Sequence, residues 1–98
     1  MGEPIQQVDP SGLRLPPSRF EGADLWELHQ QIVRFGASKD GMPPLFVHED
    51  PDGVLEISDG VTRATRMAKL APGMTVPVLI IGKYRRSRAK SPSVGDRL

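Results

Sequence analysis

An unbroken run of aliphatic residues near the C-terminus, VPVLII over residues 76–81, most constrains how this chain can fold. A continuous apolar run of this length, followed by Gly82, is typical of a strand that is buried on both faces at the centre of a sheet. Other strands must therefore lie beside it, and helices must cover it. Ten glycines and ten prolines among 98 residues keep those other elements short, because both residue types interrupt regular structure.

Shorter patterns predict the elements around this central strand. Apolar residues recur at the spacing of a helix from Leu25 to Phe35, and Trp26 is expected at the rim of the core. The patterns predict, in chain order, a strand over residues 5–8, a helix over 24–35, a hairpin of 45–48 and 54–57, a helix over 60–70 and the strand over 76–81. This order predicts a small α+β domain in which two main helices pack on a mixed β-sheet.

The composition excludes several classes of protein. The absence of cysteine excludes disulfide scaffolds, thiol catalysis and cysteine-ligated metal sites. No metal site is expected, because His29 and His48 lack partners at ligand spacing and the acidic stretch over residues 49–53 is an ordinary turn sequence. No apolar run reaches the roughly 20 residues of a membrane span, and residues 1–4 lack the features of a secretory signal. A cytoplasmic protein without a membrane partner is therefore expected.

Charge divides the chain into two parts. Residues 83–98 hold six basic residues and one acidic residue, a net charge of +5, so residues 1–82 carry −4. Because the C-terminal part has little apolar content, we expect a folded domain over residues 1–82 and a flexible basic tail over 83–98. Such a tail could contact nucleic acid, act as a solubilising terminus, or clamp onto the acidic body. The residues expected to contact nucleic acid are Lys83, Arg85, Arg86, Arg88 and Lys90.

The junction before the second predicted helix combines the parts of an anion site. Gly60 provides a tight turn, the helix N-terminus provides free backbone N–H groups, and Thr62 and Arg63 add a hydroxyl and a guanidinium. Arg66 lies one helical turn after Arg63 and extends a cationic face. A phosphate group is the ligand that this combination predicts. The same residues also fit an ordinary helix start, with an aspartate or serine N-cap and a solvated basic face.

Several short motifs run through the chain in a recognisable order. They are VDP at residues 8–10, LR at 13–14, Arg19, ADLWEL at 23–28, MPPLFV at 42–47, ISDGVTR at 57–63 and VPV at 76–78. Their order and spacing resemble the ParB/sulfiredoxin superfamily, in particular the ParB-like N-terminal domain that is often labelled a ParB-like nuclease. The resemblance covers residues 5–82 and implies a stand-alone domain of this fold, without the helix-turn-helix and dimerisation domains of partition proteins.

The turn at residues 60–63 carries the functional part of this resemblance. ParB proteins have glycine-glutamate-arginine-arginine there and hold a nucleotide triphosphate, whereas sulfiredoxins have a catalytic cysteine in the same turn. Gly60 and Arg63 match the shared glycine and arginine. Val61 stands where the glutamate or cysteine is expected, and Thr62 stands where the arginine or histidine is expected. Sulfiredoxin chemistry is therefore excluded, and the residue best suited to organise a metal ion or water for CTP hydrolysis is missing.

Three hypotheses of function follow from the residues and the resemblance. The first is binding of a phosphate-bearing ligand, either a nucleotide with its Mg²⁺ or a nucleic-acid backbone. The second is a nuclease or nucleotide hydrolase, in which Asp59 is the nearby carboxylate able to act as metal ligand or base. The third is a protein-binding adaptor without catalysis. The phosphate ligands expected under the first hypothesis are Gly60, Thr62, Arg63, Arg66 and Arg19.

Overall fold

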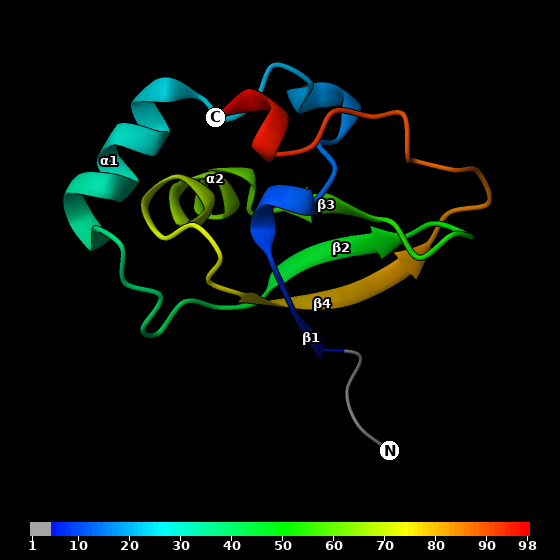
Figure 1. Ribbon diagram of the computed structural model, residues 1–98, viewed down its shortest axis with the longest axis horizontal. Coiled ribbons are helices and arrows are strands. Elements are labelled where there is room, and N and C mark those ends of the chain that lie inside the picture. The colour runs from blue at the N-terminus through cyan, green and yellow to red at the C-terminus, as the bar shows by residue number, and fades with distance from the viewer. Residues whose placement is uncertain (1–4) are drawn as a thin grey trace.

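Four strands form one mixed sheet, and two helices lie on the same side of it (Figure 1). The computed structural model describes residues 5–98; residues 1–4, on which the expectation about a secretory signal rests, lie outside the described part. The elements are β1 (Ile5–Val8), α1 (Leu25–Phe35), β2 (Leu45–Glu49), β3 (Leu55–Asp59), α2 (Val61–Leu70) and β4 (Val76–Lys83), with 3₁₀ turns η1 (Pro10–Gly12), η2 (Pro17–Arg19) and η3 (Gly95–Arg97). The predicted α+β class is confirmed.

β4 lies inside the sheet, as the aliphatic run predicted. The strand order is β1-β4-β2-β3. β4 pairs antiparallel with β1 and parallel with β2, while β2 and β3 form an antiparallel hairpin. Because β3 runs antiparallel to β2, it ends beside the start of β2, and α2 begins at that point. The chain then returns through α2 to the start of β4.

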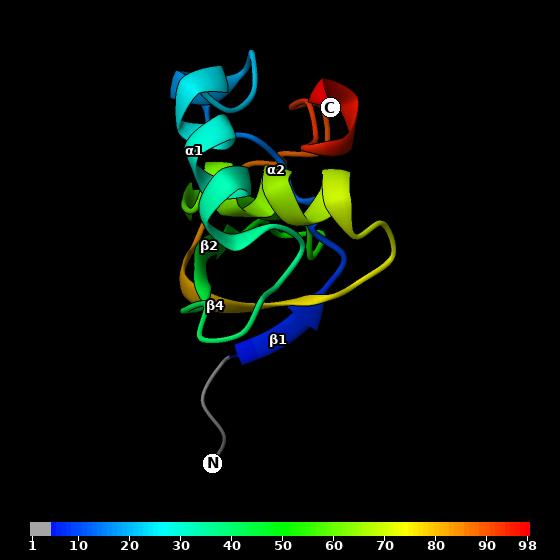
Figure 2. The ribbon, with the colours of Figure 1, turned by 90° about the vertical axis from the view of Figure 1, so that its left-hand side faces the viewer.

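Helices cover only one face of the sheet. Val76 and Val78 on β4 are fully buried in the core, whereas Ile81 on the same strand is 49% exposed. Both helices lie on the same side of the sheet, and no described helix covers the opposite side (Figure 2). The expectation that the central strand is buried on both faces is therefore wrong. A sheet covered by helices on one side leaves alternate side chains of each strand exposed on the other.

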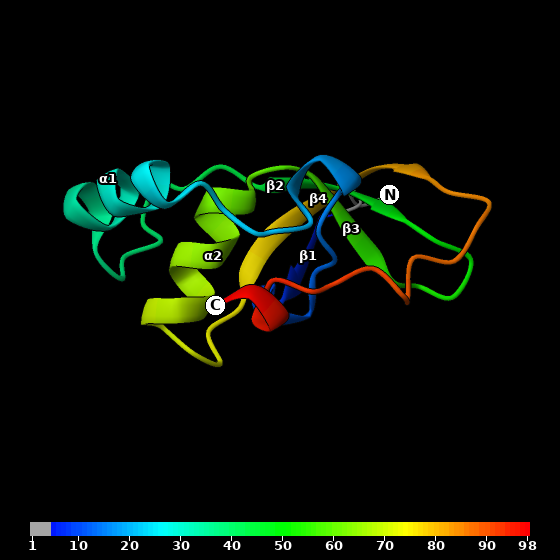
Figure 3. The same cartoon turned by 90° about the horizontal axis from the view of Figure 1, so that it is seen from above.

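α1 has one buried side and one exposed side. Its N-terminus is capped by Asp24, whose Oδ1 accepts a hydrogen bond from the Glu27 N–H at 2.9 Å. Leu28 is buried, but Leu25 is 81% and Trp26 is 67% exposed. The expected place of Trp26 at the rim of the core is wrong, because α1 packs mainly beside α2 and not on the sheet (Figure 3). Neither helix of the described chain has the length and apolar character needed to cross a membrane.

The C-terminal segment, residues 84–98, is folded onto the domain. Residues 13–15 lie along the free edge of β3, and residues 92–94 lie along the other side of residues 13–15. The Val94 N–H donates to the Leu13 carbonyl at 2.8 Å, and Val94 is 1% exposed within the core. The predicted flexible tail is therefore wrong, because the segment completes one edge of the sheet.

A buried charge cluster holds the C-terminal segment in place. Glu56 on β3 is 2% exposed, and its Oε2 lies 3.3 Å from Nε of Arg88. The Arg88 guanidinium lies 4.0 Å from the ring centroid of Tyr84, whose hydroxyl donates to Glu56 Oε1 at 3.4 Å. Burial and the nearby Glu56 charge raise the pKa of Tyr84, so this hydroxyl keeps its proton. The segment thus matches the clamp alternative, in which ionic contacts order a part of the chain that has few apolar residues.

Asp50 ties the same segment to the turn between β2 and β3. Its Oδ1 accepts hydrogen bonds from the Asp52 and Val54 N–H groups at 2.8 Å, and its Oδ2 accepts one from the Arg88 N–H at 2.7 Å. Burial alone raises the pKa of Asp50, but these N–H donors and a hydrogen bond with Ser87 hold it below its ordinary value of 3.8. The acidic turn is therefore an internal anchor for the C-terminal segment.

Replacing Asp50 with asparagine is expected to destabilise the protein at neutral pH, because asparagine keeps an oxygen acceptor but loses the charge that strengthens its hydrogen bonds. The folded-state pKa of Asp50 lies below its unfolded value of 3.8, so the wild-type advantage is present above that pH and is lost as the pH falls through the folded-state pKa. Urea unfolding of both proteins between neutral and strongly acidic pH measures this difference.

The matched control for this experiment is Asp52→Asn, which removes an exposed carboxylate from the same turn. We expect this control to unfold like the wild type at each pH. Equal stability of the wild type and Asp50→Asn at neutral pH would show that Asp50 does not anchor the segment.

Candidate functional site

A polar cavity of about 280 Å³ opens at the junction of β3 and α2. It lies between this junction, the η2 turn and α1. Its lining residues are Ser18 and Arg19 from η2, Glu27 and Gln31 from α1, and Ser58, Asp59, Gly60, Val61, Thr62 and Arg63 from the junction. The structure thus brings together five residues that the sequence singled out, namely Arg19, Asp59, Gly60, Thr62 and Arg63.

Gly60 makes the turn from β3 into α2. Its φ is +111°, in the left-handed region, and it occupies the N-cap position. A Cβ atom there would lie 2.5 Å from Cδ2 of the buried Leu45, so a side chain has no room. Because glycine has no side chain to cap a helix, the first N–H groups of α2 stay uncapped beside the polar cavity. The alternative of an ordinary aspartate or serine N-cap is therefore wrong.

Arg63 is held at the wall of the polar cavity by two contacts. Its Nη1 donates to the Pro43 carbonyl at 3.0 Å, and its Nη2 lies 3.4 Å from Oδ2 of Asp59. The Arg63 side chain is 19% exposed, whereas the Asp59 side chain is 67% exposed. An ion pair with an exposed partner contributes little stability in water, so another anion can replace Asp59 at small cost. The guanidinium is therefore positioned, while its ionic partner is exchangeable.

Glu27 is a cavity residue that the sequence did not reveal. The Thr62 hydroxyl donates to Glu27 Oε2 at 3.4 Å, which links α2 to α1. Gln31 lies one turn further along α1 and lines the same cavity. A signal was present in the spacing, because Glu27 and Gln31 lie four residues apart on either side of Leu28, the buried residue of α1. Polar side chains at this spacing share one face of the helix, at the edge of its contact with α2.

Arg66 does not line the polar cavity. It is 2% exposed, and its Nη1 donates to the carbonyls of Gly36 and Ser38 at 2.7 Å each. The expectation of a solvated cationic face that includes Arg66 is therefore wrong. The physical reason is the loop after α1, whose carbonyl groups lie against α2 at this position and need donors when they are buried.

The residues predicted to contact nucleic acid lie away from the polar cavity. Leu45 at the start of β2 meets Gly60, whereas Glu49 at the end of β2 lies 3.8 Å from Nζ of Lys83. The length of β2 separates the two places, about 13 Å at the usual rise of a strand. The loop after Lys83 lies at the end of the molecule opposite α1 (Figures 1 and 3). Arg88 is engaged in the buried charge cluster, while the exposed members of the set are Lys83, Arg85, Arg86 and Lys90.

The carboxylates of the polar cavity do not form a metal centre. Among residues 5–98, no group of three or more histidine, aspartate or glutamate side chains is arranged to hold a metal ion. Comparisons with protein-family models, with curated proteins and with solved structures found no match for this chain. The comparisons therefore assign no function to the cavity.

Replacing Gly60 with alanine is expected to lower the free energy of unfolding by about 2 kcal/mol or more, because a side chain is strained at this φ and the new Cβ would press on Leu45. Urea denaturation measures the loss. Gly53→Ala is the matched control, because Gly53 has a φ of +84° but nothing within 4 Å of the added Cβ. If the two variants lose the same stability, the contact with Leu45 does not contribute.

Proposed function

We propose that this chain binds a phosphate-bearing ligand, a nucleotide or a nucleic-acid backbone, in the polar cavity. The observation that carries the proposal is the start of α2 at Gly60, which leaves the helix without a side-chain cap beside a cavity that Arg19 and Arg63 line. The N-terminus of a helix carries about half a positive charge and free N–H donors. An oxyanion in the cavity would therefore meet the donors that the fold leaves open.

Three cavity side chains fit the same class of ligand. The Ser18 hydroxyl can donate to phosphate oxygens, and Arg19 and Arg63 can form charge-assisted hydrogen bonds with them. The Thr62 hydroxyl would have to leave Glu27 to do the same, and the Ser58 hydroxyl pairs with Nδ1 of His48. The Asp59 carboxylate competes with an anion for Arg63, but its exposure makes it the weaker partner. A bound phosphate would take the place of Asp59 at Nη2 of Arg63.

The resemblance of residues 57–63 to the phosphate-binding turn of the ParB/sulfiredoxin superfamily supports a nucleotide in particular. A nucleotide carries Mg²⁺ on its own phosphate oxygens, which suits a cavity whose residues do not assemble a resident metal site. A nucleic acid could contact both the polar cavity and the exposed basic residues beyond β4 only if it extended from one to the other. A cytoplasmic location stays a prediction.

Replacing Arg63 with alanine is expected to weaken binding of CTP, ATP and inorganic tripolyphosphate by about 10- to 100-fold. This is the usual loss of affinity when a hydrogen bond to a charged group is removed. Isothermal titration calorimetry measures the affinity, and circular dichroism checks that the fold is intact. Arg86→Ala is the matched control, because it removes the same charge from the exposed loop after β4. An unchanged affinity in Arg63→Ala would overturn the assignment of this cavity.

The enzyme hypothesis makes a different prediction for Asp59. If the cavity only binds phosphate, Asp59→Asn removes the competing partner of Arg63 and tightens tripolyphosphate binding by about 2- to 5-fold, the value of an exposed ion pair. If Asp59 is a catalytic base, the wild type turns over a nucleotide or cleaves DNA, and Asp59→Asn abolishes turnover while it still binds. Parallel assays of binding and of phosphate release with Asp59→Asn distinguish the two hypotheses.

The adaptor hypothesis has one structural observation in its favour. α1 presents three large apolar side chains to solvent, with Leu25, Trp26 and Val33 between 67% and 81% exposed. The absence of binding to CTP, ATP, tripolyphosphate and a DNA duplex would favour this third hypothesis.

A further inference from the structure

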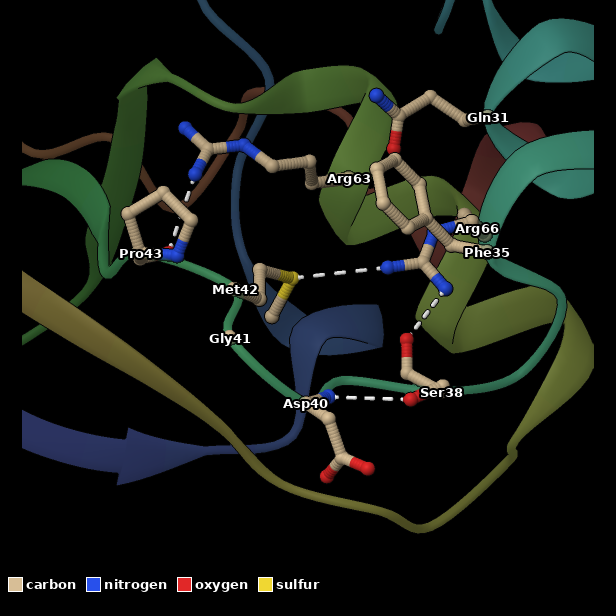
Figure 4. Close-up of a pocket in the computed structure, with 9 residues that line it drawn as sticks. All are labelled: Gln31, Phe35, Ser38, Asp40, Gly41, Met42, Pro43, Arg63 and Arg66. Atoms are coloured by element: carbon tan, nitrogen blue, oxygen red, sulfur yellow. Dashed lines mark hydrogen bonds between the residues drawn. The ribbon is translucent and has the colours of Figure 1, made fainter.

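A second cavity, of about 310 Å³, shares Gln31 and Arg63 with the polar cavity. Figure 4 shows the residues that line it. It is enclosed by α1, the loop of residues 36–43 and α2. Phe35, Met42 and Pro43 give it apolar walls, and Arg66 closes one side. We call this cavity the Arg66 pocket. Its volume is at the lower end of the range for small-molecule sites, so it suits a compact ligand.

The Arg66 guanidinium is hydrogen-bonded at one end and lacks an oxygen partner along one edge. Its Nη1 donates to two backbone carbonyls, those of Gly36 and Ser38. Its Nη2 reaches only the sulfur of Met42, at 3.8 Å, and its Nε is buried without a hydrogen-bond partner. Nε and Nη2 lie side by side in the guanidinium plane, and this pair is a bidentate donor for two oxygens. Figure 4 shows Nη2 directed across the pocket toward Met42.

The charge of Arg66 also lacks a partner. Among residues 5–98, no carboxylate lies within ion-pair distance of this guanidinium, which is 2% exposed. Asp40 lines the pocket, but its carboxylate points away from Arg66 in Figure 4. A buried cation without an anion is costly, because it loses its hydration without gaining an ion pair. An anion bound in the pocket would compensate this cost.

Gln31 adds a second unpaired group to the pocket. Its Oε1 is buried and has no hydrogen-bond partner in the described chain. A ligand with an N–H donor would satisfy it. The Phe35 ring, with Cζ of Arg34 and Cζ of Arg66 each 5.4 Å from its centroid, adds an aromatic wall to the pocket.

We propose that the Arg66 pocket binds a small planar carboxylate with an aromatic or apolar body. The carboxylate would accept two hydrogen bonds from Nε and Nη2 of Arg66, the body would lie against Phe35 and Met42, and an N–H group would donate to Gln31. A carboxylate fits better than a phosphate, because one planar edge satisfies both of its oxygens. A phosphate would leave further oxygens unpaired against apolar walls.

Three probes of similar size test this proposal by amide-resolved NMR titration of the full chain. Pyrrole-2-carboxylate offers the carboxylate and the N–H, benzoate offers the carboxylate alone, and pyrrole-2-carboxamide offers the N–H without the charge. We expect pyrrole-2-carboxylate to bind with shifts centred on Phe35, Met42 and Arg66, benzoate to bind several-fold more weakly, and the carboxamide to bind at least tenfold more weakly. Equal binding of the charged and uncharged probes, shifts centred on Gly60, or no binding of pyrrole-2-carboxylate would overturn the proposal.

Substitution of Gln31 provides the decisive variant, because Arg66 also supports the loop after α1 and its replacement can prevent folding. Gln31→Leu is expected to reduce the affinity for pyrrole-2-carboxylate to the level of benzoate, while the benzoate affinity stays unchanged. Gln30→Leu, at an exposed neighbouring position outside the pocket, is the matched control and should alter neither affinity. If Gln31→Leu binds pyrrole-2-carboxylate like the wild type, the assigned orientation of the ligand is wrong.

The Arg66 pocket shares Gln31 and Arg63 with the polar cavity, but its ligand is tested separately from the proposed phosphate function. Titration of the same proteins with tripolyphosphate reports on the polar cavity, where the expected shifts centre on Gly60 and Thr62. Shifts at Phe35 and Met42 with the carboxylate, but none at Gly60 with tripolyphosphate, would support the pocket while rejecting the phosphate site. The reverse pattern would reject the pocket alone.

Discussion

The contact between Gly60 and the buried side chain of Leu45 is the constraint on which the arrangement of this protein depends. The left-handed turn at Gly60 brings the chain from the end of β3 directly into α2, with no space for a side chain between the turn and the sheet. α2 therefore lies close on the core, and its residues line both cavities. Arg63 is shared by both cavities, whereas Arg66 reaches only the apolar one. One turn thus positions an uncapped helix N-terminus and the buried guanidinium of Arg66, six residues after Gly60.

The sequence predicted the elements well because helices, turns and strands depend on local patterns. The 60–63 turn was also predictable, since its residues are contiguous and one glycine determines their geometry. Burial was less predictable, because it depends on which elements meet. The exposure of Trp26 follows from the packing of α1 beside α2, and the exposure of Ile81 follows from the placement of both helices on one face. Arg66 shows the same limit, because the carbonyl groups that hold it come from a loop 28 and 30 residues earlier.

The C-terminal segment shows why composition alone is a poor guide to order. Its apolar content is low, and by that measure it cannot repay the entropy of folding. Its order comes instead from specific pairs, the contact of Arg88 with Glu56 and the hydrogen bond between Asp50 and the Arg88 backbone. These partners lie 32 and 38 residues apart in the chain. Counting charges along the sequence shows that acidic and basic residues are both present, but it does not show which of them contact each other in the fold.

The pairing of residues 13–15 with residues 92–94 has a consequence for how the protein is made. A chain that leaves the ribosome can form the hairpin of β2 and β3 early, because those strands are neighbours in sequence. The edge beyond β3 cannot be completed until residue 94 has been synthesised. Until then the backbone groups along residues 13–15 lack their final partner and remain open to strands of other chains. Rapid release and closure of the C-terminal segment would therefore protect the newly made protein from aggregation.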